Sequence, residues 1–150
     1  MPPPPQFGTH LITNIRNVKS PHWRQRRKPE NRCVVQYADT KPKKTPMWFA
    51  FDDTRPLAVF AGVWATWTGK RGTKANPVEG EHTLFGFLTC DSNDVVGAVH
   101  PKAMPVILTS DAEIEQWMTA PAEEALKLQR PLPDRVLKVV ASGERKDEAA

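Results

Sequence analysis

Residues 57–67 form the longest apolar run of the chain, and this run limits most strongly what the chain can fold into. Its length suits a single buried strand. Gly62 interrupts it, so we expect a core strand with a bulge or a bend at that residue. A membrane-spanning helix is not expected, because no run approaches the about 20 apolar residues that cross a bilayer.

Shorter apolar or aromatic runs occur before and after this one, and turn-forming residues separate them. They predict further strands over residues 11–16, 32–37, 47–51, 83–89, 106–108 and 135–141. Residues 69–80 are polar and show no hydrophobic period. Two interpretations of that segment stay open, a loop that faces a substrate and a plain extension of a hairpin.

The sequence pattern changes after Leu108, where a helix is predicted. Ser110 and Glu113 have the spacing of a capping box, in which the first residue caps the helix and the second lies three positions on. Pro121 predicts the start of a second short helix over residues 122–129. The apolar face of the first helix is expected to consist of Ile114, Trp117 and Met118.

Many short strands followed by two late helices predict an α+β fold with a curved mixed sheet or an open barrel at its centre. The 150 residues fit one domain with a real core. We expect a Pro-rich extended arm over residues 1–10, the domain over 11–141 and a disordered tail over 142–150. The first residues lack the basic and apolar regions of a secretion signal, so a cytoplasmic location is expected.

Positive charge is concentrated in the first third of the chain. Residues 1–46 hold ten Lys or Arg against two acidic residues, whereas residues 47–150 hold eleven against fifteen. Arginines near an exposed Trp23 would suit single-stranded nucleic acid, through phosphate contacts and base stacking. A solvated basic loop around a core tryptophan fits the composition equally well. The basic cluster consists of Arg16, Lys19, Arg24, Arg26, Arg27, Lys28 and Arg32.

His100 and Lys102 stand two positions apart, just before the apolar run that ends at Leu108. A histidine at the mouth of a strand suits proton transfer near neutral pH, and the lysine beside it can hold an anionic substrate. The alternative is a hydrogen-bonded turn histidine next to a solvated surface charge. The residues themselves leave both interpretations open.

No motif for a cofactor or a metal was found in the sequence. It has no phosphate-binding glycine loop and no nucleophile elbow, and its histidines and cysteines lack ligand spacing. We therefore expect no metal and no small-molecule cofactor. Cys33 and Cys90 are expected to be reduced, and Cys33 is interpreted as a buried strand residue rather than a nucleophile.

Eight segments, taken in order, resemble one known family. They are TNIRN at 13–17, SPHWR at 20–24, RC at 32–33, YADTKP at 37–42, KTPMWFA at 44–50, LAVFAGVW at 57–64, TLFGFLT at 83–89 and HPKAMPVIL at 100–108. No single segment is decisive, but the ordered set is specific. Over residues 11–140 the chain resembles the SOS response-associated peptidase (SRAP) family.

The resemblance implies a chemistry. SRAP proteins use an N-terminal cysteine, exposed when the initiator methionine is removed, to trap the aldehyde of an abasic site in single-stranded DNA as a thiazolidine. A glutamate and a histidine assist proton transfer, and an asparagine and an arginine hold the site. Matched by motif, His100 is the histidine, Asn14 the asparagine and Arg16 the arginine, while Lys102 takes the place of a basic residue. The peptidase label then describes self-processing of the N-terminus.

The chain departs from the family pattern in two places. It begins Met1-Pro2 instead of Met-Cys-Gly, so the N-terminal part of the pattern is expected to be missing. The segment between Cys33 and Tyr37 is shortened, and Gln36 stands nearest to the place of the glutamate. A glutamine keeps hydrogen bonds but cannot exchange a proton.

The resemblance and the two departures together give the expected function. We expect a SRAP-like protein of the SOS response that recognises abasic sites in single-stranded DNA and has weak or absent crosslinking. The alternative is a non-covalent single-stranded DNA-binding module. The DNA contacts are expected from Arg16, Trp23, Arg24 and Lys102, and no membrane partner is expected.

Overall fold

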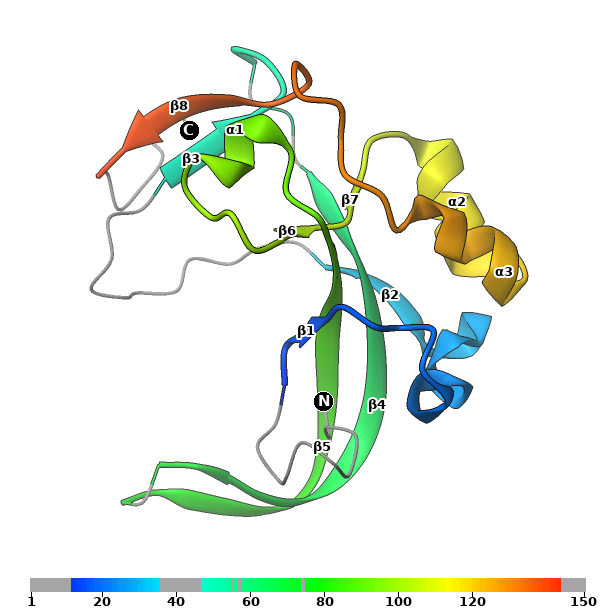
Figure 1. The fold of residues 1–150 in the computed structure, drawn as a ribbon. Coiled ribbons are helices and arrows are strands. Elements are labelled where there is room, and N and C mark those ends of the chain that lie inside the picture. The colour runs from blue at the N-terminus through cyan, green and yellow to red at the C-terminus, as the bar shows by residue number, and fades with distance from the viewer. Residues whose placement is uncertain (1–11, 36–46, 55, 57, 74, 144–150) are drawn as a thin grey trace.

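The computed structural model describes residues 12–35, 47–54, 56, 58–73 and 75–143. Within them it shows a strongly curled six-stranded sheet, a separate two-stranded sheet and a few short helices (Figure 1). The predicted α+β class with a curved mixed sheet is confirmed. The Pro-rich arm, Gln36 and residues 144–150 lie outside the described residues, so the predictions about them stay predictions.

Two long antiparallel strands, β4 (Val59–Gly72) and β5 (Pro77–Cys90), form the centre of the curled sheet. The edge strand β1 (Asn14–Ile15) runs parallel to β5, and β2 (Arg32–Val35) runs antiparallel to β4 on the other side. The short strands β6 (Met104–Pro105) and β7 (Ile107–Leu108) pair with β5 and β4 respectively. Val106 lies between them and bonds to both long strands, so the strand predicted over residues 106–108 crosses from one to the other.

The other elements lie around this sheet. The second sheet pairs β3 (Met47–Ala50) with β8 (Lys138–Ser142), which runs one residue past the predicted end of the domain. None of the helices described is long and apolar enough to cross a membrane. The helices are η2 (Pro21–Trp23), η3 (Gln25–Arg27), η4 (Pro29–Asn31), α1 (Asp94–Gly97), α2 (Asp111–Thr119), α3 (Ala122–Ala125) and η5 (Leu126–Leu128).

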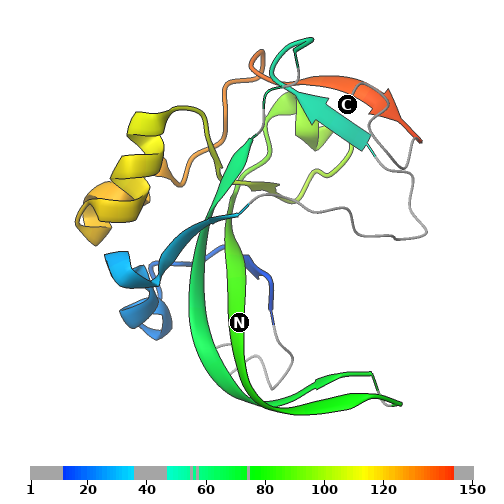
Figure 2. The same cartoon turned by 180° about the vertical axis from the view of Figure 1, so that it is seen from behind.

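The polar segment 69–80 continues the β4–β5 hairpin, which confirms the second of the two interpretations. The register is unbroken from Gly62, opposite Phe87, to Gly72, opposite Pro77. The predicted bulge at Gly62 is therefore absent from this ladder, and the strands bend smoothly instead (Figures 1 and 2). An antiparallel ladder pairs the backbone N–H and C=O groups of polar residues as well as those of apolar ones. The strands therefore continue into residues 69–80, although these residues show no hydrophobic period.

A packed ring pair supports this extension. The rings of Trp67 and His82 stack with centroids 6.0 Å apart, and His82 Nε2 lies 3.1 Å from the carbonyl oxygen of Gly69. A Cβ at position 69 would lie 2.3 Å from the Trp67 ring. Glycine at this position therefore leaves the space that the indole occupies.

The core lies between the convex face of the curled sheet and the helices. Ile15 of β1, Val63 of β4 and Leu88 of β5 point to this face and are almost completely buried. Trp117 of α2 is 1% exposed and is buried with them. Figures 1 and 2 show α2, α3 and the turns η2–η4 on this side of the sheet.

Arg32 is an unexpected member of this interior, because the sequence places it in the basic cluster. Only 3% of the residue is exposed. Its Nη1 donates to the carbonyl oxygens of Trp117 and Ala120, each at 2.7 Å, and its guanidinium lies 5.5 Å from the Trp117 ring centroid. It therefore binds the carbonyls at the C-terminal end of α2, where a cation is favourable. Burial lowers the pKa of Arg32, and the charge of Glu30 opposes that shift.

The N-terminal end of α2 follows the predicted capping box in part. Ser110 Oγ accepts the Glu113 N–H at 3.3 Å, as expected. The Glu113 carboxylate reaches one residue further back than the box requires, and it accepts from the N–H and the hydroxyl of Thr109 at 2.8 and 2.9 Å. Its other oxygen accepts from Arg130. Burial alone would raise the pKa of Glu113, but these bonds lower it on balance.

The substitution Glu113→Gln is expected to lower the free energy of unfolding at pH 7 by about 1–2 kcal/mol, because the bonds to Thr109 and Arg130 lose their charge. The folded protein binds this proton less tightly than the unfolded chain, so the contribution is present above the ordinary pKa of 4.5 and is lost as the pH falls below it. Urea unfolding from pH 7 to pH 3 should show the two proteins converging. The exposed Glu115→Gln is the control, and a difference that stays constant with pH would contradict the assignment.

Candidate nucleic-acid interface

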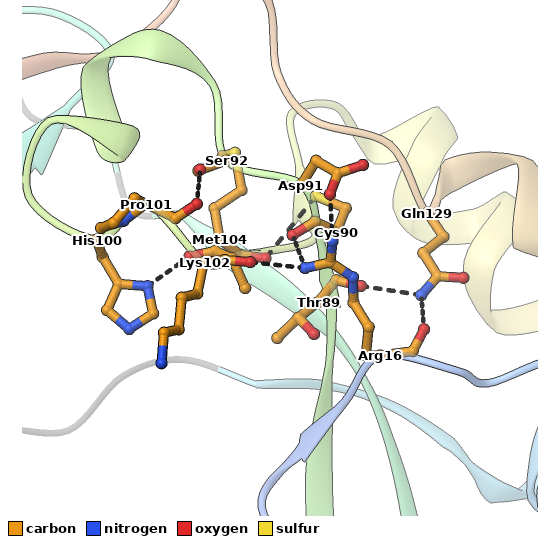
Figure 3. A network of polar contacts seen from close by, with 11 residues as sticks. Arg16, Thr89, Cys90, Asp91, Ser92, His100, Pro101, Lys102, Met104 and Gln129 are labelled. Carbon is orange, nitrogen blue, oxygen red and sulfur yellow. Dashed lines mark hydrogen bonds and ion pairs between the residues drawn. The ribbon is translucent and has the colours of Figure 1, made fainter.

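Arg16 joins two of the segments that were singled out in the sequence. Its Nη1 donates to the carbonyl oxygen of Cys90 at 3.0 Å and to that of Lys102 at 2.9 Å. Its Nη2 pairs with the carboxylate of Asp91 (Figure 3). The planar guanidinium presents its donors in a fixed fork and binds several oxygens at once, whereas a lysine offers a compact ammonium without that fork. The TNIR segment is thereby bound to the loop that carries His100.

Gln129 holds the other end of Arg16. Its Nε2 donates to the carbonyl oxygen of Arg16 at 2.8 Å and to that of Thr89 at 2.9 Å (Figure 3). Both the backbone and the guanidinium of Arg16 are therefore fixed by the protein. The sequence analysis missed Gln129, because an isolated glutamine after a short helix gives no signal of its own.

His100 lies in the exposed loop between α1 and β6. The ring atom Nδ1 is 2.9 Å from the carbonyl oxygen of Ala103. The backbone N–H of His100 donates to the carbonyl oxygen of Val96 at 2.7 Å. A carbonyl only accepts, so Nδ1 carries a proton and the neutral ring keeps its lone pair on Nε2. Nε2 has no hydrogen-bond partner in the part of the chain that the structure describes. The geometry is that of a hydrogen-bonded turn, and it leaves Nε2 open to a ligand.

Lys102 is exposed in the same loop and forms no ion pair with any described residue. Its side chain and the His100 ring leave the loop in the same direction (Figure 3). Three contacts fix this loop: Arg16 to the Lys102 carbonyl, Ser92 Oγ to the Pro101 carbonyl at 2.9 Å, and His100 to the Ala103 carbonyl. The loop therefore holds a free cation and an imidazole on a rigid base.

Asn14 is exposed on β1, in register with Phe87 of β5. Residues opposite each other in a ladder share a face, so Asn14 lies on the concave face with Phe87, and so do Phe85 and Trp64, which pair with each other. The rings of Phe85 and Phe87 contact edge to face, with centroids 5.6 Å apart, and Phe85 is 50% exposed. Sequence analysis missed this surface, although the alternation Phe85-Gly86-Phe87 predicts two rings on one face.

Trp23 and Arg24 lie on the other side of the sheet. Trp23 is 3% exposed and belongs to the core, so the interpretation as a core tryptophan holds, and its indole is not available for base stacking. It anchors the turn η2, next to which Arg24 is exposed. The four residues predicted to bind DNA therefore do not form one surface. Arg16 and Lys102 meet at the His100 loop, while Arg24 lies on the helix side.

Cys90 has the environment of a structural cysteine. It is buried, and its Sγ lies 3.8 Å from the carbonyl oxygen of Met104. Burial raises the pKa of the Cys90 thiol, and the nearby Arg16 only partly offsets this. A thiol that stays protonated is a poor nucleophile. Among the described residues, no three His, Cys, Asp or Glu side chains come together as metal ligands.

Comparison with protein families agrees with this arrangement of segments. The family model described as SOS response associated peptidase (SRAP) matches residues 12–144, which is most of the chain. The chain belongs to the SRAP family. A search of curated proteins gives no match. The SRAP match includes both Arg16 and the loop that it binds, so the two segments joined in space belong to one family unit.

Proposed function

We propose that this SRAP protein binds single-stranded DNA on the concave face of its sheet and recognises abasic sites there. The hydrogen bond from Arg16 to the Lys102 carbonyl carries the proposal. It joins residues 86 positions apart and brings the strand of Asn14 to the loop of His100. This contact holds the two segments together, so that residues of both can act on one ligand.

The side chains present suit a strand that has lost one base. Lys102 offers a cation to a phosphate, and the exposed Phe85 ring offers a surface on which an intact base stacks. The Asn14 amide can bind a sugar hydroxyl or a carbonyl oxygen. The positions of these groups suit a ligand with an anionic backbone and a few flat rings.

His100 is proposed as the proton-transfer residue. An abasic sugar opens to its aldehyde when the ring oxygen gains a proton and the hydroxyl at the anomeric carbon loses one. Protonated His100 can give the Nε2 proton to the ring oxygen, since Nδ1–H keeps its bond to Ala103 in both charge states. The ring then does not need to turn between the two steps.

Stable crosslinking needs an α-amine and a thiol on the same residue. Cys33 and Cys90 are internal, so their nitrogens are amides, and the Cys90 thiol is buried. We therefore propose that neither of these two cysteines forms a lasting covalent bond to DNA, and that the residues described above recognise the strand non-covalently, in the cytoplasm, as part of the SOS response. A non-covalent single-stranded DNA-binding module with no proton transfer at all is the second candidate, and the hydrogen-bonded turn geometry of His100 favours it.

Two single strands test this proposal, one with a single abasic site and one intact, each run on native and denaturing gels. A native shift that denaturation abolishes is expected, stronger for the abasic strand. Lys102→Ala should weaken binding of both strands. The negative slope of log K against log salt should become shallower by about 0.7. Lys127→Ala, whose lysine is paired with Glu124, is the control. Absence of any shift would contradict the function, and a band that survives denaturation would contradict non-covalent recognition.

A further inference from the structure

A second basic surface lies on the helix side of the sheet, away from the His100 loop. It is formed by residues 19–28 on the turns η2 and η3, and we call it the η surface. Figures 1 and 2 show these turns and β1 on opposite sides of the long strands. The proposed DNA site on the concave face does not include it. The basic residues of the η surface are Lys19, Arg24, Arg26, Arg27 and Lys28.

The charges of the η surface are not neutralised within the described chain. Glu30 is the one acidic residue between positions 12 and 35, and it forms no ion pair with the described residues. The helix α2 packs against η4, but its Glu113 is already bonded to Thr109 and Arg130. Arg26 and Arg27 each keep a buried Nε–H that has no partner among the described residues. The donors of this surface thus exceed the acceptors that the fold provides.

The η surface is held rigidly. Trp23 is buried beneath it, and the Arg26 guanidinium lies 5.6 Å from the centroid of that indole. Asn31 Nδ2 donates to the carbonyl oxygen of Gln25 at 3.0 Å, and Arg32 Nε donates to that of Arg27 at 2.7 Å. The backbone that carries the free cations is therefore fixed from below. A rigid set of cations loses less entropy when an anion binds.

The chemistry of the η surface favours phosphate in a nucleic-acid backbone. Three of its five cations are arginines, whose planar forks match phosphate oxygens. A membrane surface would also need apolar side chains that insert, and the large exposed apolar residues of the described chain lie elsewhere, at Val78, Phe85, Val99 and Val139. Burial lowers the pKa of Arg26, and a phosphate beside it would favour its charged form.

We propose that the η surface is a second DNA-binding site, which holds the phosphate backbone of the same single strand after it has passed around the sheet. This inference rests on the proposed function, since the concave face binds the first part of the strand. A strand that fills only the concave face is too short to reach the η surface. The length of the DNA strand therefore distinguishes binding at the concave face alone from binding at both sites.

The test compares single-stranded oligothymidylates of about 6 and about 20 nucleotides by fluorescence anisotropy at several salt concentrations. The double variant Arg24→Glu with Lys28→Glu should bind the long strand about 10-fold more weakly. Its slope of log K against log salt should be shallower than that of the wild type by about 1.4. Its affinity for the short strand should not change. Arg71→Glu with Arg135→Glu makes the same change in charge at exposed positions elsewhere and is the control.

Each result distinguishes the two proposals. Equal losses on both strands, or a loss no larger than in the control, would overturn the second site and leave the concave site standing. A wild-type protein that binds the long strand no better than the short one would overturn it too. No binding of the short strand would instead contradict the concave site. Tighter binding of a duplex through Arg24 and Lys28 would overturn the assignment to a single strand. Arg24→Gln with Lys28→Gln repeats the test without charge reversal.

Discussion

Replacing Trp117 by alanine is expected to lower the free energy of unfolding by about 3–5 kcal/mol. The indole is 1% exposed, and it fills the space between α2 and the convex face of the sheet. Its loss also removes the ring over which the Arg32 guanidinium lies. The buried Arg32 guanidinium has lost its contact with water, and without the Trp117 ring it also loses the group that partly replaces that contact. Urea unfolding followed by circular dichroism measures the effect.

Two further variants make the Trp117 result specific. Glu115→Ala changes an exposed residue of the same helix and should alter the free energy of unfolding by no more than about 0.5 kcal/mol. Trp117→Phe keeps an aromatic ring near Arg32, and its loss in the free energy of unfolding should lie between those of Glu115→Ala and Trp117→Ala. A loss below about 1 kcal/mol for Trp117→Ala would show that the helix layer does not depend on this side chain.

Replacing Arg16 by methionine is expected to release the His100 loop while the long strands stay closed. The variant removes the bonds to Cys90, Lys102 and Asp91 but keeps an unbranched apolar stem at this position. Hydrogen bonds from a charged donor contribute about 1.5–3 kcal/mol in favourable settings, and the half-exposed position of this guanidinium reduces that figure. We expect amide exchange over residues 98–103 to become about 10-fold faster, as measured by hydrogen exchange and mass spectrometry.

Exchange over residues 84–89, in the β5 ladder, should stay unchanged in the Arg16 variant. Arg24→Met is the matched control, because the Arg24 side chain is exposed and has no partner among the described residues. Arg16→Lys should behave like the methionine variant, since an ammonium cannot reach all three oxygens. Unchanged exchange in the loop would mean that Ser92 and Ala103 fix it without Arg16. This test does not depend on DNA binding.

Arg16 binds other parts of the chain in the structure, which differs from the role that the family resemblance implied. The resemblance assigned Arg16 to holding the site, and its guanidinium was expected to bind phosphate. In the structure it donates to two carbonyls and a carboxylate of the chain itself. Lys102 is the cation of this region that remains free within the described residues. We therefore expect an Arg16 variant to affect DNA binding through the loop, and a Lys102 variant to act on the ligand directly.

Sequence patterns that depend on neighbouring residues predicted well. The spacing of Ser110 and Glu113 predicted the start of α2, because a helix cap is formed within one turn. Apolar runs at residues 57–67 and 83–89 predicted the inner parts of β4 and β5, whereas the polar outer parts of these strands were left open between a loop and a hairpin extension. The family resemblance and the α+β class depended on such local segments taken in order, and both are confirmed.

Only the tertiary structure decided where the charged and aromatic residues act. The sequence grouped Arg16, Trp23, Arg24 and Arg32 in one basic cluster. Packing instead bound Arg16 to the His100 loop, buried Trp23 and Arg32, and left Arg24 on the helix side. The partners of the Arg16 guanidinium and of Arg32 Nη1 lie 74 to 88 positions away in the sequence. Local spacing determines helices and strands because their bonds are short-range, whereas the surroundings of a long cationic side chain depend on which distant carbonyls the fold brings within its reach.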